Sequence, residues 1–207
     1  MQKHWRPSFV FMDRNNEAAI IAGLKEKDEA CCKHFVHLHQ DNVFGQAFRM
    51  LGNRPDAEEA TQDAFIKAIE RIHAFKGECK LSSWLFRITY TTCLDLLKKR
   101  KRSQNEVDID DAVLPAWVQI ESAVESMELN EQKKLINDSL EKMGGIDAML
   151  IDLFHLQEMN ISEIEEITGL KHSAVKVRLM RARKKLGVFL EQSLPSETLK
   201  ELKHVRG

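Results

Sequence analysis

The 207-residue sequence contains few of the residues that interrupt helices, with only nine glycines and four prolines. It also lacks the alternating runs of β-branched residues that a β-sheet needs. No stretch reaches the roughly 18 consecutive apolar residues that span a bilayer, and the apolar patch near the N-terminus is too short and interrupted for a signal peptide. These absences predict an all-α, cytoplasmic chain with no membrane insertion.

The patterns of metal sites and of catalysis are also missing from the sequence. The four cysteines, Cys31, Cys32, Cys79 and Cys93, form no CxxC pair, and reduced thiols that pack as small apolar groups are ordinary in the cytosol. The segment Cys31–His39 (CCKHFVHLH) is rich in cysteine and histidine, but structural zinc needs four well-spaced ligands. With no Gly-rich phosphate loop and no nucleophile–base pair, the sequence predicts no metal, no cofactor and no enzyme.

Charge of both signs is plentiful and lies in separate blocks, although the net charge is only −1. Residues 98–102 are five consecutive bases, KKRKR. Residues 103–166 then carry 16 acids and 3 bases, whereas residues 167–190 carry seven bases and no acid. This segregation predicts two cationic surfaces joined by an acidic connector.

Apolar spacing predicts four helices in the first half of the chain, over residues 16–25, 28–52, 56–75 and from Ser82 or Ser83 to the KKRKR run. We expect Asp56 to be an N-cap, with Glu58 and Glu59 in the first turn, where the helix dipole favours acids. A turn is predicted over residues 76–78.

The second half of the chain predicts helices over residues 120–143 and 147–157, followed by two further helices. Residues 103–117 are acidic, contain a proline and show little periodicity, which is typical of a flexible linker. The fold is therefore predicted as two helical bundles, residues 15–102 and 121–190, joined by a flexible acidic linker over residues 103–120. Residues 191–207 form a tail without an assigned role.

The stretch Ile161–Lys185 (ISEIEEITGLKHSAVKVRLMRARKK) predicts a helix-turn-helix. Ser162 and Glu165 fit a capping box at the start of the first helix, and Gly169 suits a left-handed helix end. A second helix is predicted to begin within Lys171–Ser173, with an apolar stripe formed by Val175, Leu179, Ala182 and Leu186.

The second of these helices is strongly basic, which suits close approach to a phosphate backbone. Its N-terminal end is predicted to enter the major groove, where Val177, opposite the apolar stripe, suits a thymine methyl group. The predicted duplex contacts are Lys171, His172, Ser173, Ala174, Lys176, Val177, Arg178, Arg181, Arg183, Lys184 and Lys185. A solvated basic helix is the alternative, and the ordered capping box, glycine and stripe favour DNA binding.

Two segments resemble the extracytoplasmic-function sigma factor family, and they stand in family order. Residues 56–102 look like the region that binds core RNA polymerase and melts the promoter, and residues 155–186 are similar to the module that reads the minus-thirty-five element. The resemblance covers residues 17–186. It implies a sigma factor that binds bacterial RNA polymerase core, directs it to promoter DNA and helps to melt the minus-ten element, and that an anti-sigma factor can occlude.

The same resemblance implies roles for particular residues. The residues implied to dock on the polymerase clamp helices are Asp56, Glu59, Gln62, Asp63 and Lys67. A solvated helix face would also account for polar side chains at these positions. The loop Phe75–Ser83 matches the one that captures a flipped base. The implied minus-ten contacts are Phe75, Lys76, Lys80, Trp84, Arg87, Tyr90, Lys98, Lys99, Arg100 and Arg102. Phe75 and Trp84 also suit a core position, and the minus-thirty-five contacts are the duplex set given above.

The sequence departs from the family pattern at Gly144–Gly145 and at Lys171–Ser173, where the family has proline-containing turns. Two other classes of protein stay open. A stand-alone helix-turn-helix regulator would recognise a palindrome as a dimer. A protein-interaction adaptor would show no salt-dependent affinity for DNA, because its basic segments would be merely solvated.

Overall fold

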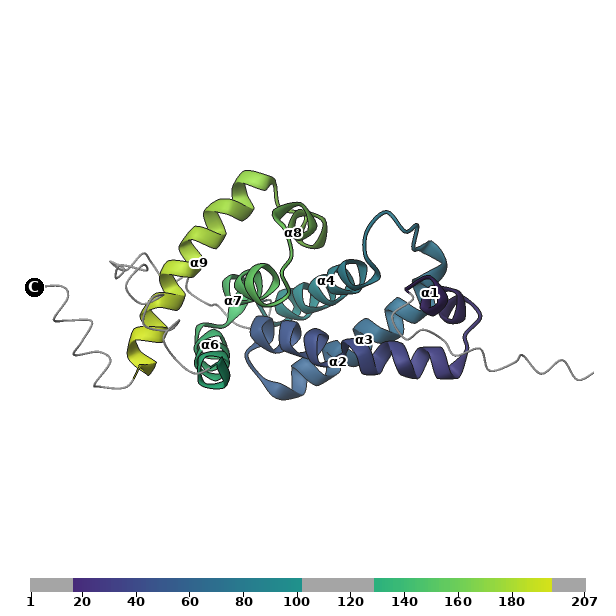
Figure 1. The fold of residues 1–207 in the computed structure, drawn as a ribbon, viewed down its shortest axis with the longest axis horizontal. Helices are drawn as coiled ribbons and strands as arrows, with labels where there is room; N and C mark the ends of the chain where they lie inside the picture. The colour runs from purple at the N-terminus through teal and green to yellow at the C-terminus, as the bar shows by residue number, and fades with distance from the viewer. Residues whose placement is uncertain (1–16, 102–128, 195–207) are drawn as a thin grey trace, which may run out of the picture.

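The computed structural model describes residues 17–101 and 129–194, and in this part of the chain helices joined by short turns and loops are the only regular secondary structure (Figure 1). The predicted all-α fold is confirmed. Arg102, the predicted linker over residues 103–120 and residues 195–207 of the predicted tail lie outside the described residues.

The N-terminal module consists of α1 (Glu17–Lys25), α2 (Glu29–Leu51), α3 (Arg54–Arg71), the 3₁₀ turn η1 (Ile72–Ala74) and α4 (Leu81–Lys101). The C-terminal module consists of α6 (Leu129–Met143), α7 (Gly145–Ile151), the π-helical turn η2 (Asp152–Leu156), α8 (Ile161–Thr168) and α9 (His172–Ser193). Figure 1 shows the two modules side by side, with the N-terminal module at the right and α9 at the far left.

The core of the N-terminal module is built around a small-residue stripe on α3. Ala57, Ala60, Ala64 and Ala68 are all buried, and their three- and four-residue spacing places them on one face of the helix. Because alanine adds little bulk, this face packs closely against both α2 and α4. Phe35 of α2 fills the space beside the stripe, where its ring meets that of Phe65 edge to face at 5.7 Å.

The helix starts in this module differ from the sequence predictions. Asn53, not Asp56, is the N-cap of α3: its side chain accepts from the Asp56 N–H, and Pro55 lies in the first turn. The prediction for α4 is also wrong, because the helix begins at Leu81, ahead of Ser82 and Ser83. The Leu81 N–H donates instead to the Glu17 carboxylate at 3.1 Å, so that α1 satisfies an otherwise unpaired helix-end donor.

The C-terminal module contains the predicted helix-turn-helix, formed by α8 and α9. Gly169 ends α8 in the left-handed conformation, with φ 70°, as predicted. The capping box is not Ser162–Glu165 but Asn160–Glu163, in which the two side chains accept each other's backbone N–H groups. The stripe Val175, Leu179, Ala182 and Leu186 is buried along α9 as predicted, and α9 continues past residue 190 to Ser193.

The two modules pack directly against each other, and buried residues of both belong to one continuous apolar cluster. α7 packs on α2, and α8 packs on α4, above which it lies in Figure 1. At the α2 contact, Arg49 forms an ion pair with the buried Asp152 of η2 at 3.5 Å and donates to Asn137 of α6 at 2.9 Å. Burial raises the pKa of Asp152, and the Arg49 charge opposes that rise.

Candidate nucleic-acid and partner interfaces

The first half of α9 presents an open cationic surface. Lys171, Lys176, Arg178 and Arg181 are exposed, as are His172, Ser173, Val177, Lys184 and Lys185 of the predicted set, whereas Ala174 and Arg183 are half-buried. No side chain caps the helix N-terminus at Lys171, so the first-turn N–H groups and the helix dipole add to the attraction for a phosphate.

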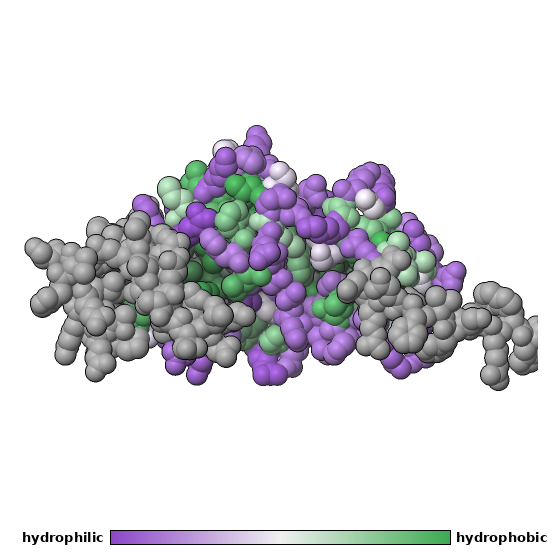
Figure 2. All heavy atoms as spheres, in the orientation of Figure 1, coloured by the Kyte–Doolittle hydropathy of each residue, from purple (hydrophilic) through white to green (hydrophobic). Residues whose placement is uncertain are grey.

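An apolar strip interrupts this cationic surface. Val177 and Met180 are 45% and 51% exposed, and their three-residue spacing puts them on one side of α9. Figure 2 shows hydrophobic residues among the hydrophilic ones along this part of the molecule. Sequence reasoning missed Met180, although its position outside the buried stripe is a usable signal, because a large apolar side chain with no core role suits contact with base edges.

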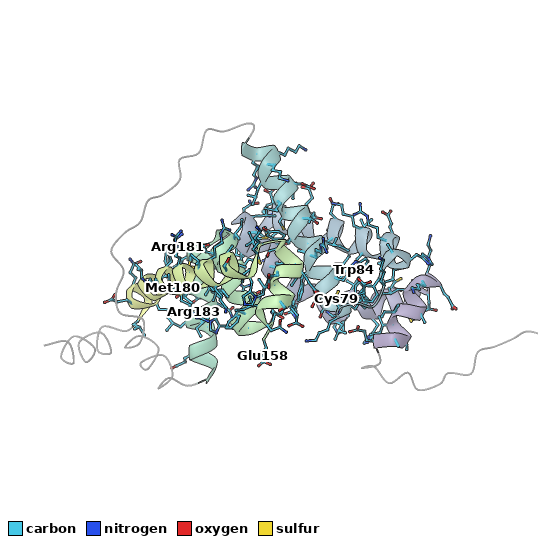
Figure 3. The ribbon with its side chains drawn as sticks, turned by 90° about the horizontal axis from the view of Figure 1, so that it is seen from above. Cys79, Trp84, Glu158, Met180, Arg181 and Arg183 are labelled. Carbon is cyan, nitrogen blue, oxygen red and sulfur yellow. The ribbon has the colours of Figure 1, made fainter. Side chains whose placement is uncertain are left out.

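Three members of the predicted set on α9 are engaged within the module. His172 lies 2.7 Å from the Glu165 carboxylate of α8. Arg183 donates from Nε to the His155 ring at 3.1 Å and lies over the Phe154 ring at 5.1 Å. Lys185 is paired with Asp147 at 2.8 Å. Figure 3 shows Arg181 and Arg183 on opposite sides of α9. The geometry therefore favours Arg181 as the DNA-facing arginine, while Arg183 and Lys185 hold α9 against η2 and α7.

The end of α4 carries the second basic cluster, and its members differ in what they contact. Lys99 is exposed, and Lys98 makes an ion pair with Asp95 at 3.5 Å. Arg100 is paired with Asp56 and donates to the Leu51 carbonyl. This pair joins a residue of the predicted DNA set to a residue of the predicted polymerase set.

The loop Phe75–Ser83, which we call the minus-ten loop, borders a cavity of about 350 Å³. The Phe75 and Trp84 rings lie 5.3 Å apart at a tilt of 52°, with Phe75 buried and Trp84 half-buried. Figure 3 places Cys79 beside Trp84 at this site. Besides these three, the cavity is lined by Ala74, Lys76, Glu78, Ser83, Arg87 and Glu166. Aromatic rings beside cations suit stacking of an unpaired base, and sequence reasoning missed Cys79 and Ser83.

Two predicted minus-ten residues lie beside the C-terminal module. Lys80 is paired with Glu163 of α8 at 2.9 Å, and this hydrogen bond raises the pKa of Lys80 and lowers the pKa of Glu163. Tyr90 is only 6% exposed, and burial raises its pKa while the nearby Arg178 of α9 opposes the rise. Lys76 and Arg87 are exposed, as predicted for DNA contacts.

The solvent face of α3 carries most of the predicted polymerase set. Glu59 and Gln62 are exposed and Asp63 half-buried, whereas Lys67 donates to Thr92 of α4 at 3.1 Å and lies 3.7 Å from Asp63. Ile66 is 55% exposed on this face. An exposed isoleucine ringed by polar side chains has the composition of a protein-docking surface.

The described residues contain no cluster of three or more His, Cys, Asp or Glu side chains that could hold a metal ion. Within Cys31–His39, burial raises the pKa of Cys31 and of Cys32, and lowers that of His39. None of the described helices combines the length and apolar composition that crossing a bilayer would require.

Comparison with known proteins gives two consecutive family matches. The family model for Sigma-70 region 2 matches residues 35–103, and that for Sigma-70 region 4 matches residues 133–186. The ECF RNA polymerase sigma factor SigW of Bacillus subtilis is 31% identical over 180 residues, which cover 80% of this chain and 92% of that protein.

Two solved structures share the fold. One is the sigma factor RpoE of Bartonella quintana in complex with the anti-sigma factor NepR, with a TM-score of 0.57, 23% identity and coverage of 77% of this chain and 96% of that chain. The other is CnrH in complex with the cytosolic domain of CnrY, with a TM-score of 0.52, 21% identity and coverage of 85% and 97%.

Proposed function

This chain belongs to the extracytoplasmic-function sigma factors, and from that premise we propose how its described surfaces divide the work of the family. A sigma factor binds RNA polymerase core and directs transcription initiation at promoter DNA. The partners of this chain are therefore core polymerase and promoter DNA, and the stand-alone regulator and the adaptor are not favoured.

The solvent face of α3 is assigned to polymerase docking. Its support is the combination of the polar residues Glu59, Gln62 and Asp63 with the exposed Ile66 at their centre. A central apolar side chain surrounded by polar groups is where binding energy concentrates in protein interfaces. Lys67, which contacts Thr92, is assigned to holding α3 against α4.

A matched pair of substitutions tests this assignment. Ile66→Arg places a charge at the centre of the face, and Leu38→Arg makes the same change at an equally exposed apolar residue of α2, 49% exposed. We expect Ile66→Arg to weaken binding to core polymerase by about tenfold or more and Leu38→Arg to leave it unchanged, as measured by fluorescence anisotropy with labelled protein. Equal effects of the two substitutions would remove α3 from the interface.

The two cationic surfaces are assigned to the two promoter elements. We assign the open side of α9, with Lys176, Val177, Arg178, Met180 and Arg181, to the minus-thirty-five duplex. The minus-ten loop and the cavity between Phe75 and Trp84 are assigned to the melted minus-ten strand, with Lys99 at the end of α4 on upstream phosphates. The observation that carries the assignment is that each cationic surface adjoins apolar or aromatic groups able to contact bases.

Transcription with purified components tests the function as a whole. Core polymerase supplied with this chain should initiate at discrete sites on genomic DNA of the source organism, whereas core alone should not. Gel shifts should show specific promoter binding only when core is present. Tight, palindrome-specific binding by the free chain would favour the stand-alone regulator.

The chain is further proposed to do no covalent chemistry of its own, since its family consists of regulators of initiation. We also propose that it acts in the cytoplasm, because its two partners, the polymerase and the promoter, are found there.

A further inference from the structure

The acidic helix α8 contacts the minus-ten loop through the carboxylate of Glu163, whose two oxygens have different partners. One oxygen of Glu163 accepts the Asn160 N–H in the capping box at 2.9 Å, and the other lies 2.9 Å from the Lys80 ammonium. The capping box fixes the position of Glu163, so that Lys80 meets a carboxylate held by its own helix. The Lys80 side chain is 67% exposed, so a DNA phosphate can reach it but must compete with Glu163 for the ammonium.

A second acid of α8 borders the cavity beside this ion pair. Glu166 lines the space between Phe75, Trp84 and Arg87, and the remaining lining residues all come from the N-terminal module. The Ser83 hydroxyl, in the same lining, is buried and has no hydrogen-bond partner among the described residues. A buried unpaired hydroxyl beside aromatic rings and a guanidinium is chemically suited to a polar base edge.

The carboxylates of Glu163 and Glu166 therefore lie where the phosphates of a bound nucleic-acid strand would lie. Glu163 forms an ion pair with Lys80, as a DNA phosphate would. Glu166 adds a second negative charge to the lining of the cavity. The same packing brings Arg178 of α9 close enough to Tyr90 of α4 to affect its pKa. One docking contact thus covers part of the surface assigned to the minus-ten strand and brings the assigned duplex-binding helix against the same module.

This arrangement is incompatible with simultaneous reading of both promoter elements. Their names place them about 25 base pairs apart, which is roughly 85 Å along B-DNA at 3.4 Å per base pair. In the structure, α8 and the minus-ten loop are in direct contact, at 2.9 Å. The 27 residues between Lys101 and Leu129 have a maximum reach of roughly 90 Å, so the covalent connection permits a separation that the docked modules do not.

We propose that α8 acts as an internal substitute for the promoter strand: Glu163 and Glu166 cover the minus-ten loop in the free chain, and single-stranded DNA competes with them for Lys80 and the cavity. The inference rests on the proposed function of the minus-ten loop. The closed arrangement is then a resting state, and the apparent affinity for single-stranded DNA falls in proportion to the fraction of chains that are open.

The test removes the two charges without removing the helix cap. Glu163→Gln/Glu166→Gln keeps the capping box, because glutamine serves at the same position. The matched control, Asp138→Asn/Glu158→Gln, removes two exposed acids of the C-terminal module that lie outside the described contacts with the N-terminal module. Binding is measured by anisotropy with a labelled pool of random-sequence single-stranded DNA, and opening is measured as the maximum particle dimension in small-angle X-ray scattering.

We expect the Glu163/Glu166 variant to bind this DNA pool about three- to tenfold more tightly than the wild-type chain, and to become more extended. The control variant should match the wild type in both measurements. Equal affinity and equal dimension in the wild type and in both variants would overturn the proposal. A gain shared equally by both variants would overturn it too, because it would reflect net charge alone.

A cross-link provides the converse test. Glu166→Cys places a second thiol on the cavity lined by Cys79, and a short bis-maleimide between them should lock the closed arrangement. The locked chain should bind the DNA pool at least tenfold more weakly than wild type treated with the same reagent, in which α8 has no thiol to link. Unchanged binding after complete cross-linking would contradict the competition.

Transcription separates this inference from the proposed function. If wild-type chain and core polymerase initiate at discrete sites while the α8 variants behave as wild type in binding, the competition is wrong and the sigma function stands. If no start-site-selective transcript appears with the wild type, the proposed function itself fails.

Discussion

The two DNA-facing surfaces of this sigma factor have similar chemistry but differ in whether the other module supplies an ion-pair partner. On α9, Lys176 and Arg181 are exposed on an open helix face, whereas Lys80 in the minus-ten loop is paired with Glu163 across the module contact. Both surfaces are cationic and both adjoin groups able to contact bases. The difference shows that packing between modules, rather than local composition, determines which of two suitable surfaces already holds a competing carboxylate.

The largest effect on the difference between the two surfaces should come from breaking the buried ion pair between Arg49 and Asp152, which joins the modules. Asp152→Ala leaves Arg49, which is 11% exposed as a side chain, without its carboxylate. Removal of one partner of a buried pair typically costs about 3 kcal/mol or more. We expect a loss of stability of that order in chemical denaturation, together with separation of the modules, which would release Lys80 of the minus-ten loop from Glu163.

The double variant Arg49→Met/Asp152→Leu is the control for this prediction. It replaces both charges by apolar groups of similar volume, which is often close to neutral, and it should recover most of the lost stability. Failure of the double variant to recover any stability would show that the pair does not act as a unit.

The open surface is tested by two arginines on opposite sides of α9. Arg181→Ala should weaken binding to duplex DNA about tenfold and reduce the slope of log affinity against log salt by about 1, because one phosphate contact is lost. Arg183→Ala, which removes the contacts with His155 and Phe154, should leave the salt slope unchanged. A salt titration of duplex binding distinguishes the two, and an equal fall in slope for both would contradict the assigned orientation.

A smaller effect is expected at the start of the covering helix. Asn160→Ala removes the side chain that accepts the Glu163 N–H at 3.0 Å, and the loss of such an N-cap costs about 1 kcal/mol. Because the same turn positions Glu163 against Lys80, the substitution should also increase binding of single-stranded DNA modestly. Asn160→Ser retains the cap and should show neither change; thermal denaturation and anisotropy provide the measurements.

The smallest effect concerns a thiol in the core shared by α3 and α4. Burial raises the pKa of Cys93 to about 12, so almost none of it is thiolate at pH 8 and it should resist alkylation in the folded chain. The unfolded thiol ionises near 9.0, so between pH 9 and 12 the unfolded state has lost a proton that the folded state keeps. Stability should therefore fall as pH rises through this window, and Cys93→Ala should reduce the fall.

Local signals predicted the helices and the helix-turn-helix, but not the exact caps. Asn160–Glu163 and Ser162–Glu165 both fit the capping pattern, and in the structure the first pair forms the cap, with Ile164 and Ile167 of the same helix buried. At α3 the sequence does carry a signal for an earlier start than Asp56, because proline is favoured in the first turn of a helix and Pro55 precedes Asp56. The position of Asn53 before it is the consistent choice of N-cap.

The sequence could not predict contacts between modules, because no local pattern encodes them. Tyr90 and Lys80 are suited to DNA by composition, yet one is buried and the other paired through contacts with residues some 80 positions away. Likewise, the helical wheel of α9 does not show that Arg183 donates a hydrogen bond to His155. Met180 and Ile66, in contrast, could have been found, because each is a large apolar residue opposite the buried stripe of its helix.

The ion pair between Arg100 and Asp56 joins one charge that the sequence predicts for DNA to one that it predicts for the polymerase. If a basic group of the polymerase engages Asp56, Arg100 is released to a phosphate, and if a phosphate engages Arg100, Asp56 is released to the polymerase. Linkage requires these two effects to be equal in free energy. Binding of promoter DNA would thus raise the affinity of this protein for the polymerase, and binding of the polymerase would raise its affinity for promoter DNA, without a conformational change between the two sites.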